Sequence, residues 1–67
     1  MDYSESDMAL YNSLHSRITR FGVDLSLYTE RFHPKAKLLV FSHKYHLGWI
    51  ITVSETNGIS VYENFYE

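Results

Sequence analysis

Apolar residues recur at helical spacing near the start of the chain and form a single stripe. The stripe consists of Met8, Leu10, Tyr11, Leu14, Ile18 and Phe21. Recurrence every three or four residues is typical of an amphipathic helix with one buried face. Ser4 and Asp7 stand where a capping box would begin such a helix, and Gly22 is a residue type that ends helices. The sequence therefore predicts a helix over residues 5–21.

Residues 23–33 carry two competing patterns. Alternating apolar positions favour a strand over residues 23–29. Asp24 could instead cap a short helix, because aspartate is a favoured N-cap residue. Pro34 ends either element, since the residue before a proline avoids helical backbone angles. We expect the strand, and the short helix stays open as the alternative.

Three later segments are rich in β-branched and aromatic residues, which favour strands. They are residues 37–42, 49–54 and 59–65, and residues 43–48 turn the chain between the first two. With no repeat and no linker, the chain is expected to form one small domain over residues 1–67. The predicted fold class is α+β: an N-terminal helix packed on a three- or four-stranded antiparallel β-meander.

The register of the last hairpin can be predicted from the parity of its apolar positions. Ile51, Val53, Ile59 and Val61 are all odd-numbered, so odd positions must pair with odd ones for the core side chains to share a face. A three-residue loop over residues 56–58 satisfies this condition, with Gly58 in the left-handed conformation. It pairs Val53 with Val61, and Trp49 and the helix stripe are expected on the same face.

The opposite face of the sheet is expected to carry Ile50, Thr52 and Tyr62. From the preceding strand it takes either Leu38, Val40 and Ser42 or Leu39 and Phe41. Residues 38–41 are apolar at both parities, whereas a strand exposed on one side is usually polar there. Three explanations remain open. Residues 23–33 fold over this face, a second copy or another protein docks on it, or the apolar groups are ordinary scattered exposure.

Composition and charge narrow the class of protein. An apolar content of 45% is too high for a disordered chain. The absence of cysteine excludes disulfides and thiolate zinc sites. The start of the chain is acidic and lacks the features of a secretory signal, and no apolar run is long enough to span a membrane. We therefore expect a cytoplasmic protein without a membrane partner, in the host cytoplasm if it is virus-encoded.

Candidate chemistry is sparse. His43 and His46 stand three residues apart, with His33 as the sole plausible third ligand, which is a weak pattern for zinc. No glycine-rich loop or nucleophile elbow is present, so we expect no catalytic residues, no metal and no cofactor. The least favoured hypothesis is a small ribonuclease-type toxin that uses these two histidines with Lys44 and Arg31.

Nucleic-acid binding is the main alternative function. Basic residues interleave with aromatic ones in the middle of the chain, a combination that suits single strands. The basic set is Arg17, Arg20, Arg31, Lys35, Lys37 and Lys44. Against this hypothesis, the net charge of the chain is −2, and most nucleic-acid-binding domains are basic overall.

The favoured hypothesis is a non-enzymatic protein-binding module, a small inhibitor or adaptor that occludes a larger protein of unknown identity. Small size, high aromatic content and a lack of motifs are typical of viral and phage accessory proteins of this kind. The expected contact residues are Val40, Ile50, Thr52 and Tyr62 on the open sheet face, with Glu63, Tyr66 and Glu67 at the acidic aromatic end. A homodimer through the same face is the alternative mode of association.

Overall fold

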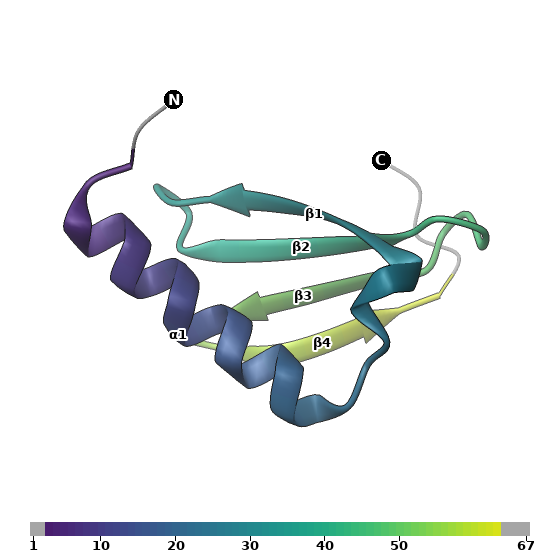
Figure 1. Cartoon of the computed structure of the whole chain (residues 1–67). Helices are drawn as coiled ribbons and strands as arrows, with labels where there is room; N and C mark the ends of the chain where they lie inside the picture. The colour runs from purple at the N-terminus through teal and green to yellow at the C-terminus, as the bar shows by residue number, and fades with distance from the viewer. Residues whose placement is uncertain (1–2, 64–67) are drawn as a thin grey trace.

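The computed structural model describes residues 3–63 of the chain. Its elements are α1 (Glu5–Phe21), the 3-10 helix η1 (Leu25–Leu27), β1 (Tyr28–His33), β2 (Leu38–His43), β3 (Ile50–Ser54) and β4 (Gly58–Tyr62). The strands form one antiparallel sheet in the order β1-β2-β3-β4, and α1 crosses one face of it (Figure 1). The predicted fold class is therefore confirmed, with four strands in the meander.

Both predicted ends of the helix are confirmed. The Ser4 hydroxyl accepts a hydrogen bond from the backbone N–H of Asp7 at 3.1 Å, which satisfies one of the free donors at the helix start. Gly22 follows the helix with φ 91°, a left-handed conformation that glycine adopts without strain. Its N–H donates to the Thr19 carbonyl at 3.3 Å, so the chain leaves the helix at the residue predicted.

The core lies between α1 and the two central strands. Its buried members are Leu14, Ile18, Leu39, Phe41, Ile51 and Val53. At the ends of the helix stripe, Met8 and Phe21 are exposed. Trp49, which directly precedes β3, and Val61 of β4 are also exposed, although we expected them on the core face. One short helix covers the centre of a four-stranded sheet and leaves its periphery open, which explains the difference.

The strand predicted over residues 23–29 is wrong. Asp24 caps the short helix η1: its Oδ1 accepts hydrogen bonds from the N–H of Ser26 at 3.1 Å and the Ser26 hydroxyl at 2.6 Å. The strand β1 begins only at Tyr28 and ends at His33, before Pro34 as predicted. Local capping by the aspartate prevailed over the alternation of apolar residues.

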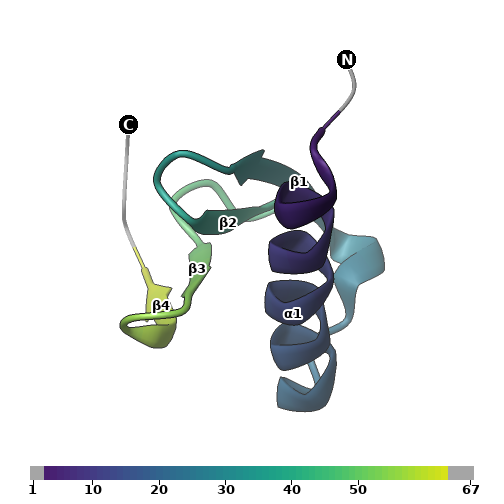
Figure 2. The same ribbon diagram turned by 90° about the vertical axis from the view of Figure 1, so that its left-hand side faces the viewer.

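The suggestion that residues 23–33 fold over the second sheet face is also wrong. Residues 28–33 instead extend the sheet as its edge strand, paired with β2 along their whole length. Figure 2 shows α1 on one side of the sheet and no described element on the other. Pairing as β1 satisfies the backbone N–H and C=O groups on one side of this segment, which a loop lying over the sheet would leave unpaired.

The predicted register of the last hairpin keeps the correct parity but is displaced by two residues. Val53 pairs with Ile59, and Val61 pairs with Ile51 instead. The closing pair is Ser54 with Gly58, and the Ser54 hydroxyl accepts the N–H of Asn57 at 2.9 Å. Gly58 has the predicted left-handed conformation, with φ 68°, but as the first residue of β4. Parity alone allows a shift of two, and the serine hydroxyl favours the three-residue turn over residues 55–57 instead of 56–58.

A polar contact links the helix to the edge strand. The Tyr11 hydroxyl of α1 donates a hydrogen bond to the Glu30 carboxylate of β1. Partial burial and this bond raise the pKa of Tyr11 from 10.0 to about 12, because both disfavour a phenolate beside a carboxylate.

This contact should make the free energy of unfolding decrease as the pH becomes alkaline. A tyrosine whose pKa is higher in the folded state stabilises the fold fully below its unfolded pKa, and the contribution is lost as pH rises through the folded pKa of about 12. We expect the free energy of unfolding of the wild type to fall more steeply above pH 10 than that of Tyr11→Phe, measured by urea denaturation. Identical pH dependence of the two proteins would contradict this expectation.

Candidate functional site

The uncovered sheet face brings together four of the predicted contact residues. Val40 and Thr52 are Cα partners across β2 and β3, and Ile50 and Tyr62 are Cα partners across β3 and β4. Their chain neighbours Leu39, Phe41, Ile51 and Val53 are buried under α1. Because side chains alternate along a strand, the four predicted residues point to the other side. We call this side the open face.

The open face is apolar along its middle and polar around it. Leu38, Val40 and Thr52 are half-buried, and Ile50 is 8% exposed although α1 lies on the other side of the sheet. Neighbouring side chains on the face therefore shield Ile50. Tyr62 is 42% exposed and carries the only ring among the four predicted residues.

A shallow hollow of about 360 Å³ lies at one end of the open face. Its lining includes the hydroxyl-bearing residues Thr52, Ser54, Ser60 and Tyr62, Lys37 from the β1–β2 turn and Asn57 from the β3–β4 turn. Hydroxyl and amide groups both donate and accept hydrogen bonds. The hollow can therefore pair with carbonyl or carboxylate groups of a docked molecule.

The charge of the open face is positive. Arg31 is the Cα partner of Val40. Its chain neighbours Glu30 and Phe32 make contacts on the helix side of the sheet, so the Arg31 side chain belongs to the open face. Lys37 adds a second cation at the rim of the hollow. Among the strand positions of this face, all of them within the described residues, there is no carboxylate. An acidic surface would be the electrostatic complement.

Lys37 has an unusual backbone conformation. Its φ is 54°, in the left-handed region, which costs a residue with a Cβ about 1 kcal/mol relative to ordinary angles. Glycine or asparagine would be the expected choice at such a turn position. The chain places a lysine there, with its side chain at the hollow.

The acidic aromatic end predicted from the sequence is described only in part. Glu63 directly follows β4 and is exposed, whereas Tyr66 and Glu67 lie outside the described residues. Glu55 lies in the turn before β4, at the other end of that strand. Glu55 and Glu63 therefore lie at opposite ends of β4.

The six cations of the alternative hypothesis do not form one surface. Arg17 and Arg20 are on α1, and Arg17 donates to the Ser54 carbonyl at 3.3 Å. Arg31, Lys35 and Lys37 lie on β1 and the turn that follows it. Lys44 lies beyond β2 and bonds the Ser26 carbonyl through Nζ at 2.8 Å.

An aromatic cluster at the β2–β3 loop was not predicted. The rings of His46 and Trp49 stack with centroids 4.1 Å apart, and His43 meets Trp49 at 5.2 Å and Tyr28 at 4.8 Å. His43 Nδ1 accepts the N–H groups of Tyr45 and His46 at 3.0 and 3.1 Å. The repeated spacing of three residues from His43 to Trp49 was the available signal.

The contacts of this cluster give His43 and His46 a structural role. Desolvation and the neighbouring His46 lower the pKa of His43, which favours the neutral ring, and only a neutral ring can accept the loop N–H groups through Nδ1. His33 lies at the far end of β1 from Tyr28, the partner of His43. Within residues 3–63, no group of three or more histidine or acidic side chains could hold a metal ion.

Two further findings concern membrane insertion and similarity to known proteins. No helix of residues 3–63 is long and apolar enough to cross a membrane. The sequence matches no protein-family model, and no curated protein or solved structure is significantly similar to it.

Proposed function

We propose that this chain is a non-enzymatic protein-binding module, a small inhibitor or adaptor that docks its open face on an acidic, partly apolar surface of a larger protein. The observation that carries the proposal is a sheet face with apolar side chains along β2 and β3 that no described element covers. A central apolar patch with a polar rim is the usual anatomy of a protein interface.

The chemistry of the partner follows from the charges of the face. Arg31 and Lys37 favour carboxylates opposite β1, and the hydroxyl-lined hollow favours hydrogen-bonding groups beside them. The left-handed conformation of Lys37 supports this assignment, because residues held in costly conformations tend to occur at functional sites.

A homodimer through this face is less well supported. An isologous dimer presents the same patch on both subunits. Two open faces would bring Arg31 and Lys37 together without any carboxylate from the strand positions of either face. A concentration-dependent melting temperature would be the sign of such a dimer.

Nucleic acid remains the second candidate occupant because Arg31, Lys37 and the hydroxyls of the hollow would also suit phosphate groups. Against it, the strand positions of the described face offer only the rings of Tyr62 and His33 for base stacking. A nucleic-acid complex would lose affinity steeply as salt rises and would disappear after nuclease treatment.

The aromatic contact can be tested with two matched tyrosine variants and a purified protein partner. We expect Tyr62→Ala to weaken binding by about tenfold or more, as truncation of an interface tyrosine does. Tyr45→Ala removes a 75% exposed tyrosine from the β2–β3 loop and should leave the affinity unchanged. Calorimetric titration gives both affinities. An effect of Tyr45→Ala alone would move the binding surface to the loop.

A further inference from the structure

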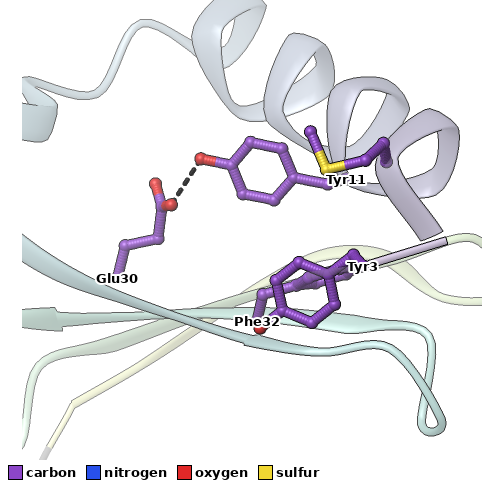
Figure 3. A pocket seen from close by; sticks show the side chains of 5 residues that line it. Tyr3, Tyr11, Glu30 and Phe32 are labelled. Atoms are coloured by element: carbon purple, nitrogen blue, oxygen red, sulfur yellow. Dashed lines mark hydrogen bonds between the residues drawn. The ribbon is translucent and has the colours of Figure 1, made fainter. Parts of the chain in front are cut away.

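A second hollow, of about 420 Å³, lies on the helix side of the sheet. It is lined by Tyr3, Met8, Tyr11, Glu30 and Phe32 (Figure 3). The helix packs chiefly against β2, β3 and β4, and the space between its first turns and the edge strand β1 stays open. The hollow has the size of a small-molecule site and is separated from the open face by the sheet itself.

Three of the five lining residues are aromatic, and their rings stand at steep angles. Phe32 meets Tyr3 with centroids 5.3 Å apart and an interplanar angle of 69°. It meets Tyr11 with centroids 5.4 Å apart and an angle of 71°. The aromatic rings therefore face in different directions around the hollow.

The only carboxylate among the lining residues is that of Glu30, and the lining contains no basic residue. The Tyr11 hydroxyl donates to this carboxylate, and the raised pKa of Tyr11 keeps the phenol neutral. His15 Nε2 lies 3.9 Å from the other carboxylate oxygen. The negative charge is thus held at the wall of a hollow that is otherwise aromatic and apolar.

We propose that this hollow binds an alkylated ammonium group, carried by a small organic cation or by a methylated lysine side chain. Aromatic faces attract such cations through their quadrupoles, most strongly where water is excluded. The Glu30 carboxylate supplies the counter-charge, and the rings with Met8 contact the methyl groups. An anion would meet the same carboxylate and be repelled. The site does not depend on the function proposed for the open face.

Choline and the neutral alcohol in which carbon replaces its nitrogen form a suitable pair of probes, because they have the same shape. We expect choline to shift the amide signals of α1 and β1 saturably in NMR titrations, and the neutral analogue to bind at least about tenfold more weakly. Equal affinity for the two would show an apolar hollow without cation recognition and overturn the proposal.

Variants with matched controls distinguish a loss of the proposed site from general effects of substitution on choline binding. Glu30→Gln keeps the shape of the side chain and should weaken choline binding by about tenfold, whereas Glu55→Gln in the β3–β4 turn should not. Tyr3→Leu removes one aromatic wall, and Tyr45→Leu is its control at the far loop. Unchanged choline affinity in both Glu30→Gln and Tyr3→Leu would overturn the assignment.

The source of the cation can be distinguished in the same assay. A peptide with trimethyllysine that binds more tightly than choline would assign the site to a modified protein tail, and the reverse order would assign it to a free cation. Either order supports the site. Failure of both probes to bind the wild type would refute it without affecting the open-face proposal.

Discussion

Replacing Phe41 with alanine is expected to remove a large part of the protein's free energy of unfolding. Phe41 is 1% exposed at the centre of the core, between the helix and the sheet. Truncation of a buried phenylalanine costs about 3–5 kcal/mol, because apolar contact is lost and a cavity remains. A domain of 67 residues has a free energy of unfolding of roughly 3–10 kcal/mol. Urea denaturation followed by circular dichroism measures the loss.

Two valines on the same side of the sheet provide the control for this prediction. Val53 is fully buried and Val61 is 58% exposed. We expect Val53→Ala to cost about 2 kcal/mol and Val61→Ala less than about 0.5 kcal/mol. If both valine variants lost stability equally, or if Phe41→Ala stayed as stable as the wild type, the core described here would be wrong.

The second large effect concerns partner binding. Arg31→Glu reverses one charge of the open face, and Lys37→Gly removes the other while keeping a residue that favours the left-handed turn. We expect the double variant to bind the protein partner about 100-fold more weakly, because like charges across an interface cost several kcal/mol. Calorimetry on the purified complex measures the change.

The matched control is Arg20→Glu, which reverses an exposed charge in the last turn of α1. It should leave the affinity within about twofold of the wild type, since the helix and the open face lie on opposite sides of the sheet. A larger loss from Arg20→Glu than from the open-face variant would place the interface on the helix.

The parts of the fold that were predicted correctly are those where several local signals agree. In α1 the apolar stripe, the Ser4 cap and the Gly22 stop all indicate the same helix, so no tertiary contact was needed to place it. The same holds for β2 and β3, where β-branched and aromatic residues leave few alternatives.

The errors occurred where local signals conflict or leave a choice. Between Val23 and His33, alternation favoured a strand too early, and the capping of η1 by Asp24 displaced its start to Tyr28. In the last hairpin, parity restricted the register without fixing it, and the Ser54 hydroxyl bond lies outside any parity argument. Both outcomes depend on side-chain hydrogen bonds that periodicity does not detect.

The two surfaces differ in how far the sequence could indicate them. The open-face residues Ile50, Thr52 and Tyr62 were placed correctly on one side because strand parity governs them. Parity did not settle Val40, since residues 38–41 are apolar at both parities, and only the pairing of Val40 with Thr52 places it there. The helix-side hollow was missed, since Tyr3 precedes the helix and Phe32 lay in the segment with the wrong strand boundary. Only the placement of the first turns of α1 beside β1 in the folded chain brings these residues together.

The most direct test of the open-face proposal compares three immobilised baits in nuclease-treated lysate of the cells in which the protein naturally occurs. The baits are the wild type, the double variant Arg31→Glu with Lys37→Gly, and the control Arg20→Glu, each first shown to be folded. Quantitative mass spectrometry should find a protein that the wild type and Arg20→Glu retain equally and that the double variant loses by about tenfold or more. If no retained protein distinguishes the double variant from Arg20→Glu, the open face is not the binding surface and the central proposal is wrong.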